Sequence, residues 1–85
     1  MPEIVIYTQP WCPYCMRAKA LLDNKGVAYT EIDARHGTPE REESRARSGG
    51  LTSVPQIFID GRHIGGCDDI MALDRAGGLD PLLAA

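Results

Sequence analysis

The segment EIVIYTQPWCPYC, residues 3–15, joins a β-branched apolar run to two cysteines that lie three positions apart. In residues 3–8 (EIVIYT), apolar side chains occupy both odd and even positions, which predicts a strand buried on both faces. After a proline-containing turn, residues 14–25 carry apolar side chains at helical spacing and end before a glycine that suits a helix C-cap. The cysteine pair therefore lies between a buried strand and the first turn of a helix.

The next part of the chain repeats this strand and helix pattern. In residues 27–33 the side chains alternate between the two faces of an extended chain, which predicts a second strand. Strand, helix and strand then form a βαβ unit, which is expected to be right-handed. Thr38 and Pro39 form a helix-start signal, with Thr38 at the N-cap. Residues 40–48 contain only Ala46 as an apolar residue. We therefore expect a thinly packed, mobile helix there.

The last part predicts a hairpin and a further helix. Residues 56–60 and 62–65 read as two strands joined through an Asp-Gly turn. Asp68 or Asp69 is expected to cap a helix over residues 70–76, and a last short turn follows it. The predicted order of elements is β-α-β-α-β-β-α.

Length and composition indicate one small globular domain over residues 1–85. Hydrophobic residues make up 44% of the chain and charged residues 25%, as in ordinary folded proteins. The net charge of -3 speaks against broad attraction to phosphate backbones, so we expect no nucleic-acid partner. No apolar run approaches the roughly 18 residues of a membrane span, and the N-terminus lacks a signal-peptide pattern. We expect a cytoplasmic monomer without a membrane partner.

The Cys12-Pro13-Tyr14-Cys15 motif predicts thiol chemistry. Cysteines at positions i and i+3 of a helix are close enough to form a redox-active disulfide, here Cys12-Cys15. Cys12 faces the unpaired N–H groups of the helix N-terminus, which stabilise a thiolate, so we expect it to be the nucleophile. Cys15 lies a turn deeper and is expected to resolve disulfides formed on Cys12. Pro13 lacks an N–H group and has a fixed φ, so it stiffens the loop.

A CxxC pair is also typical of half a metal site. A zinc site needs about four ligands at suitable spacing. The other candidates are Cys67, His36 and His63, none of which belongs to a second paired motif. We therefore expect no metal, and we interpret the two histidines as isolated, solvated surface residues.

Three segments together carry a family resemblance: residues 7–15 (YTQPWCPYC), 53–59 (SVPQIFI) and 65–69 (GGCDD). In this order and at these spacings the chain resembles the dithiol, CPYC-type glutaredoxins, most of all the short bacterial members, and the match extends into residues 73–83. The resemblance implies an α/β chain with a thioredoxin fold, in which helices flank a four-stranded mixed sheet.

The same resemblance implies a glutathione-dependent thiol-disulfide oxidoreductase. Such an enzyme reduces protein–glutathione mixed disulfides with Cys12 alone and protein disulfides with Cys12 and Cys15, and glutathione is its co-substrate. The implied partners are glutathione, glutathionylated or disulfide-containing proteins, and glutathione reductase, which acts indirectly through glutathione.

The resemblance also implies a glutathione groove. The cysteinyl portion would pair with the backbone of Val54 beside a cis Val54–Pro55 bond. The γ-glutamyl carboxylate would meet the amides of Cys67 and Asp68, and a carboxylate of Asp68 or Asp69 would take the α-amino group. One of these two aspartates is expected to be only the N-cap, and the sequence does not decide which. The implied glutathione-binding residues are Gln9, Tyr14, Ser53, Val54, Pro55, Gly66, Cys67, Asp68 and Asp69.

Three further side chains lie near this groove in the sequence pattern. Tyr14 is expected to form a wall of the groove. Trp11 either shields the Cys12 sulfur or presents an aromatic face to protein substrates. Cys67 is expected to be a small, buried or half-buried thiol without a catalytic role. A further set, expected in the core, comprises Tyr7, Tyr29 and Phe58.

The chain departs from the family pattern at two positions. Many members carry a lysine three residues before the first active-site cysteine, whereas this chain has Gln9, so we expect a less strongly stabilised Cys12 thiolate. An arginine often found before Thr-Val-Pro is also absent, and the candidates to compensate are Arg17, Arg45 and Arg47. Two alternatives stay open: a redoxin reduced by thioredoxin reductase, and an iron–sulfur or soft-metal module.

Overall fold

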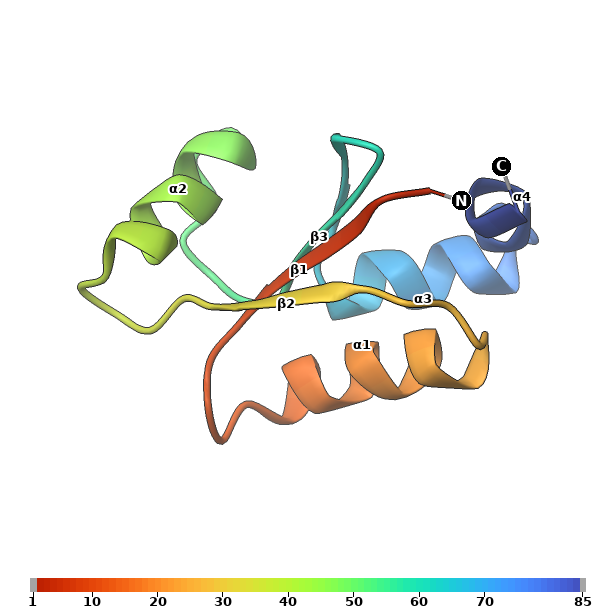
Figure 1. Ribbon diagram of the computed structural model, residues 1–85, viewed down its shortest axis with the longest axis horizontal. Helices are drawn as coiled ribbons and strands as arrows, with labels where there is room; N and C mark the ends of the chain where they lie inside the picture. The colour runs from red at the N-terminus through yellow and green to blue at the C-terminus, as the bar shows by residue number, and fades with distance from the viewer. Residues whose placement is uncertain (1, 85) are drawn as a thin grey trace.

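The computed structural model describes residues 2–84 and contains one four-stranded mixed sheet (Figure 1). The strands are β1 (Ile4–Thr8), β2 (Thr30–Asp33), β3 (Gln56–Ile59) and β4 (Arg62–Gly65), in the spatial order β2-β1-β3-β4. β1 runs parallel to β2 and antiparallel to β3, and β3 runs antiparallel to β4. All five residues of β1 are buried, which confirms the two-faced strand predicted from its sequence.

Four helices complete the described chain. α1 (Pro13–Asn24) and α3 (Cys67–Arg75) cover one face of the sheet, and α2 (Pro39–Arg47) lies on the other side (Figure 1). α4 (Leu79–Ala84) follows α3 at one end of the sheet. This arrangement agrees with the thioredoxin fold that the resemblance implied.

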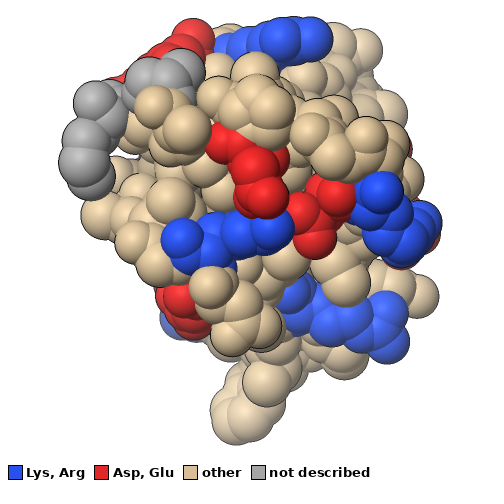
Figure 2. All heavy atoms as spheres, turned by 90° about the vertical axis from the view of Figure 1, so that its right-hand side faces the viewer, with Lys and Arg blue, Asp and Glu red and all other residues tan. Residues whose placement is uncertain are grey.

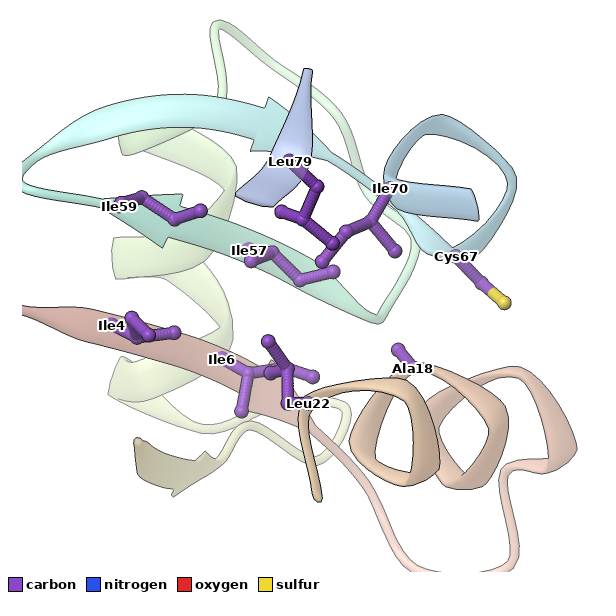
Figure 3. Packing of buried hydrophobic residues seen from close by; sticks show 9 residues of the cluster. All are labelled: Ile4, Ile6, Ala18, Leu22, Ile57, Ile59, Cys67, Ile70 and Leu79. Carbon is purple, nitrogen blue, oxygen red and sulfur yellow. The ribbon is translucent and has the colours of Figure 1, made fainter. Parts of the chain in front are cut away.

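Side chains of successive strand residues point to opposite faces, so the core consists of two clusters. The larger cluster lies between the sheet and helices α1, α3 and α4 (Figure 3). Its buried members are Ile4, Ile6, Ala18, Leu22, Ile57, Ile59, Cys67, Ile70 and Leu79. The smaller cluster, on the opposite face, contains Val5, Tyr7, Ala34 and Phe58.

Arg47 extends the smaller cluster from α2. Its guanidinium carbon lies 4.2 Å from the ring centroid of Phe58, and its Nη1 donates a 2.8 Å hydrogen bond to the hydroxyl of Tyr7. Ser44 is the one buried residue of the nine in α2, whereas Ala46 is exposed. The helix is therefore thinly packed, as its sequence predicted, and Thr38 caps it.

Two predicted elements differ from the structure, one in its first residue and the other in its type. The predicted strand 27–33 is wrong at its start, because β2 begins only at Thr30. The register pairs Thr30 with Val5, so residues 27–28 lie opposite residues 2–3, ahead of β1. The expected short turn after α3 is instead the six-residue helix α4.

The prediction that Asp68 or Asp69 caps the last long helix is also wrong. The N-cap of α3 is Gly66, whose backbone is extended, and the helix begins at Cys67. Asp69 is the third helical residue, and its Oδ2 accepts a 2.9 Å hydrogen bond from the backbone N–H of Gly66. An acidic side chain at this position satisfies an amide that the helix itself leaves unpaired.

His63 is not the isolated surface residue that we predicted, whereas His36 is exposed as expected. The β3–β4 pairing sets His63 opposite Phe58, and their ring centroids lie 5.0 Å apart. Its Nε2 is 2.7 Å from Oε1 of Gln56. The hairpin therefore makes this histidine part of the packed structure.

The end of the molecule at which α4 lies (Figure 1) carries interspersed charges (Figure 2). Figure 2 shows basic and acidic side chains side by side on one face. Lys25, at the C-cap of α1, places its Nζ 2.7 Å from a carboxylate oxygen of both Asp74 and Asp80, and so joins α1 to α3 and α4. Within residues 2–84, no helix has the length and apolar character needed to cross a membrane.

Candidate functional site

Cys12 occupies the N-cap of α1, between the end of β1 and the helix. Its Sγ accepts a 3.2 Å hydrogen bond from the backbone N–H of Cys15 and lies 4.0 Å from the carbonyl oxygen of Val54. Only 8% of Cys12 is exposed. A helix N-terminus and an amide donor both favour negative charge on a sulfur atom at this position.

Cys15 lies one turn into the helix and is 1% exposed. Burial, followed by the hydrogen bond with Cys12, raises the pKa of the Cys15 thiol to about 12. All three cysteines are in the free form. The two sulfurs therefore differ in character: one accepts an amide hydrogen bond at the helix start, and the other is protonated at neutral pH.

A groove of about 270 Å³ lies beside the cysteine pair, where the segment before β3 meets the start of α3. The Val54–Pro55 bond in this segment is cis, as the resemblance implied. Eight of the nine predicted glutathione-binding residues line the groove, together with Leu51 and Gln56. The eight are Tyr14, Ser53, Val54, Pro55, Gly66, Cys67, Asp68 and Asp69.

The two aspartate side chains of the groove differ in their hydrogen bonding. Asp69 is engaged with the Gly66 amide, whereas Asp68 is exposed and has no hydrogen-bond or ion-pair partner among residues 2–84. Gly65 is required here, because its φ is +120° and an added Cβ would lie 2.3 Å from Oδ2 of Asp69. The structure therefore leaves Asp68 as the available carboxylate, a choice that the sequence left open.

Cys67 is at once a groove residue and a core residue. It is 4% exposed, and Figure 3 shows it at the edge of the larger cluster, at the start of α3. Burial raises the pKa of its thiol. Both observations favour a structural thiol.

A second cavity, of about 360 Å³, shares no lining residue with the groove. It contains both active-site cysteines and the loop before α1, and it extends to β2. Gln9 lies here, so the structure does not bring it together with the other predicted binding residues. The full lining is Thr8, Gln9, Pro10, Trp11, Cys12, Cys15, Met16, Lys19, Glu31 and Asp33.

Trp11 is 96% exposed and has a φ of +61°, which is uncommon for a bulky residue. A side chain this exposed does not cover the Cys12 sulfur, so the shielding alternative is wrong. An unpartnered indole beside the nucleophile leaves the second alternative, an aromatic face available to protein substrates.

Arg41 is the residue that sequence reasoning missed. Its Nη1 donates hydrogen bonds of 2.9 Å to Oε1 of Gln9 and to the carbonyl oxygen of Ala34, and its Nε and Nη2 donate to the carbonyl oxygen of Thr52. The guanidinium thus lies beside the position where related proteins carry lysine. Nothing in the sequence distinguishes Arg41 from the other arginines of α2.

The arginines that we considered as compensating cations lie elsewhere. Arg45 pairs with Glu42 on the exposed side of α2, and Arg47 is held on the smaller core cluster. Arg17 does lie near the groove, because its guanidinium carbon is 5.5 Å from the ring centroid of Tyr14.

Within residues 2–84, no group of three or more His, Cys, Asp or Glu side chains is arranged to hold a metal ion. The cysteine pair therefore lacks neighbouring side chains that would complete a site of about four protein ligands. What the arrangement does offer is two adjacent sulfurs beside a groove of mixed polar and apolar lining, which suit thiol–disulfide exchange.

Comparison with known proteins assigns this combination of fold and site to one family. The family model of glutaredoxin matches residues 4–64. A glutaredoxin of Pseudomonas aeruginosa is 59% identical over 85 residues, which is 100% of both chains, and Glutaredoxin 3 of Escherichia coli K12 is 59% identical over 98% of this chain and 99% of its own. The solved buckwheat glutaredoxin–glutathione complex superposes with a TM-score of 0.86 at 35% identity, covering 98% of this chain and 77% of that one. This chain belongs to the glutaredoxin family of glutathione-dependent thiol-disulfide oxidoreductases.

Proposed function

We propose that this glutaredoxin reduces protein–glutathione mixed disulfides through Cys12 alone and protein disulfides through Cys12 together with Cys15. The observation that carries the proposal is the position of the Cys12 Sγ, which accepts the Cys15 amide at 3.2 Å and lies 4.0 Å from the Val54 carbonyl oxygen at the groove. The amide hydrogen bond favours the thiolate form of Cys12, and the same sulfur lies next to a binding surface.

In the first reaction, the Cys12 thiolate attacks the glutathione sulfur of a mixed disulfide. The bond between glutathione and the protein sulfur breaks, and the protein leaves as a thiolate that takes up a proton. A second glutathione thiolate then attacks the sulfur of the glutathione held on Cys12. Glutathione disulfide leaves, and Cys12 returns to the thiolate form.

In the second reaction, Cys12 attacks a protein disulfide and forms a mixed disulfide with one of its sulfurs. Cys15, which is buried against Cys12, then attacks the Cys12 sulfur and displaces the reduced protein. Two glutathione molecules reopen the Cys12–Cys15 disulfide, and glutathione reductase regenerates them. Cys15 is too buried to meet an outside substrate first.

The groove supports glutathione as the co-substrate. The first backbone amides of α3, at Cys67 and Asp68, form a site for the γ-glutamyl carboxylate, because a helix N-terminus binds anions. The free carboxylate of Asp68 suits the α-amino group. The backbone of Val54 pairs with the cysteinyl portion, and Tyr14 forms a wall.

Arg41 supplies the cation that is missing at position 9. It contacts both Gln9 and Thr52, and Thr52 lies between the groove residues Leu51 and Ser53. A guanidinium there attracts the glycine carboxylate of glutathione, and Gln9 contributes by holding the guanidinium through its Oε1. The presence of this cation supports glutathione over thioredoxin reductase as the source of electrons.

We also propose that the protein is a monomer and holds no resident metal. A cytoplasmic location fits this chemistry, since disulfide reduction by glutathione requires a reducing compartment. The first test measures NADPH oxidation with a small glutathione mixed disulfide, with glutathione plus glutathione reductase in one arm and thioredoxin reductase alone in the other. Turnover is expected only with glutathione; turnover with thioredoxin reductase alone would support the redoxin alternative.

The division of roles is tested with two single substitutions. Cys15→Ser is expected to retain mixed-disulfide reduction and to abolish protein-disulfide reduction, while Cys12→Ser abolishes both. If Cys15→Ser lost both activities with its fold intact, the proposed roles of the two cysteines would be wrong.

A further inference from the structure

Cys15 must ionise to act as the resolving thiol, and its surroundings oppose this. The side chain is almost completely buried, and a thiolate is disfavoured where water is excluded. In the resolving step Cys12 is part of a mixed disulfide, so its own contribution to the raised pKa of Cys15 is gone and burial remains. The site therefore needs a group that favours the thiolate.

Lys19 has the position of such a group. It lies four residues after Cys15 on α1, so both side chains are on the same face of the helix. Helical side chains lean toward the N-terminus, which directs Lys19 back over the turn that carries Cys15. Both residues line the second cavity, away from the glutathione groove. Burial raises the pKa of Cys15, and a backbone hydrogen bond with Gln9, followed by the charge of Lys19, lowers it. Lys19 is the side-chain cation in this set.

An anchor on the sheet holds Lys19 there. Its Nζ donates a 3.0 Å hydrogen bond to Oε2 of Glu31, and the same oxygen accepts a 2.6 Å hydrogen bond from the hydroxyl of Thr8. Glu31 pairs with Ile6 in the β1–β2 register, so it lies on the sheet face that packs on α1. Thr8 is 3% exposed, and the anchor is therefore built into the central strand.

We propose that Lys19, held by Glu31 and Thr8, is a positioning residue for the resolving step, in which its ammonium group supports the Cys15 thiolate. The inference rests on the proposed resolving role of Cys15. Cys15 gives its proton to water in the second cavity, and its thiolate attacks the Cys12 sulfur. The bond from Cys12 to glutathione breaks, and glutathione leaves as a thiolate. Cys15 is oxidised and glutathione is reduced in this exchange, while Cys12 stays in a disulfide throughout.

The charged and titratable groups around Cys15 come from two elements. α1 contributes Cys12 and Lys19, and β2 contributes Glu31 and Asp33, all of which line the same cavity. Asp33 is paired with Arg35 at 2.9 Å. Lys19 is therefore the one cation among the described residues that line this cavity.

The test measures how fast the Cys12–glutathione mixed disulfide closes to the Cys12–Cys15 disulfide. Reduced protein is mixed with glutathione disulfide, quenched with acid and analysed by mass spectrometry between pH 6 and 9. A rise of one unit in the pKa of Cys15 would lower its thiolate fraction about tenfold. The greater nucleophilicity of the more basic thiolate restores about threefold, so Lys19→Met is expected to close roughly threefold more slowly.

Two further variants separate this role from a general effect of charge. Lys19→Arg keeps the cation and is expected to close at nearly the rate of the unmodified protein. Lys25→Met removes one positive charge from the other end of α1 and is expected to leave closure unchanged. Burial keeps the pKa of Cys15 above the pH range of the assay, so the Lys19→Met deficit should stay constant between pH 6 and 9. Rescue by Lys19→Arg, which a purely structural defect would not allow, identifies the charge as the cause.

The last arm repeats Lys19→Met in a Cys15→Ser background, where no closure occurs. Mixed-disulfide reduction is expected to equal that of Cys15→Ser alone. The proposal is overturned if Lys19→Met closes at the normal rate, or if it slows the reaction equally in the Cys15→Ser background. If the unmodified protein forms no Cys12–Cys15 disulfide, the proposed dithiol function itself fails, which is a different result.

Discussion

Replacing Gly65 with alanine tests how the end of β4 shapes the glutathione groove. Gly65 has a φ of +120°, and an added Cβ would lie 2.3 Å from Oδ2, 2.7 Å from Cγ and 2.8 Å from Cβ of Asp69. Rotation of the Asp69 side chain relieves the first two contacts but not the third, because the Cβ is fixed to the backbone of α3. The start of the helix must therefore shift.

The expected loss of stability has two parts. A residue with a Cβ at positive φ costs roughly 1 to 2 kcal/mol. Displacement of Asp69 from the Gly66 amide, now bonded at 2.9 Å, costs about 1 kcal/mol more, as for other helix caps. A total of about 2 to 3 kcal/mol lowers the Tm of a domain of this size by roughly 10 to 20 °C.

Gly61→Ala is the matched control. Gly61 also has a positive φ, of +78°, but an added Cβ would meet nothing within 4 Å. It therefore isolates the backbone cost, about 1 to 2 kcal/mol.

Denaturant unfolding and steady-state kinetics with a glutathione mixed disulfide measure both consequences. Gly65→Ala should be less stable than Gly61→Ala by about 1 kcal/mol, and it alone should raise the KM, because Gly66 and Asp68 move with the start of α3. Equal destabilisation of the two variants, with the KM unchanged in both, would refute the argument from the Asp69 contact.

Two further predictions concern single carboxylates. Asp68→Asn should raise the KM for glutathione mixed disulfides with little change in kcat or stability, because the free carboxylate of Asp68 is the proposed partner of the α-amino group; Asp69→Asn, which keeps an oxygen for the Gly66 amide, should change the KM less. The hydrogen bond from Thr8, followed by Lys19, lowers the pKa of Glu31 below its ordinary value of 4.5, so its ionised form stabilises the folded state above about pH 4.5 and this contribution is lost as the pH falls further. Denaturant unfolding of Glu31→Gln should accordingly show a deficit at pH 6 that narrows toward pH 3, and a deficit independent of pH would contradict the assigned contacts.

Much of the fold was predictable because the relevant patterns are local. The continuous apolar run in residues 3–8 and the Asp-Gly turn of the hairpin reflect backbone geometry over a few residues, and both appear in the structure. Errors arose where an element boundary depends on strand pairing or on a backbone conformation that the side-chain pattern does not specify. The start of β2 is set by its register with β1, and the start of α3 is set by the extended backbone of Gly66; neither follows from local spacing.

The residues of the candidate site also fall into those that local spacing predicted and those that it could not. The i and i+3 spacing of Cys12 and Cys15 at a helix start is enough to predict which sulfur meets the helix amides. The sequence could not select Arg41, because its contact with Gln9 joins residues 32 positions apart. Several arginines of α2 are equivalent until the packing of that helix orients one of them toward the loop.

The sequence by itself therefore determined the order of most elements and the pair of reactive sulfurs, since each depends on short-range spacing. Its three motifs also carried the resemblance to the family. Only the tertiary structure decided that Asp68 is free while Asp69 is engaged, and that Trp11 is exposed. It alone joined Lys19 on α1 to Thr8 and Glu31 on two strands. The physical reason is that a side chain's partners depend on how separate elements pack, whereas the tendency of a segment to form a helix or a strand depends on the residues within it.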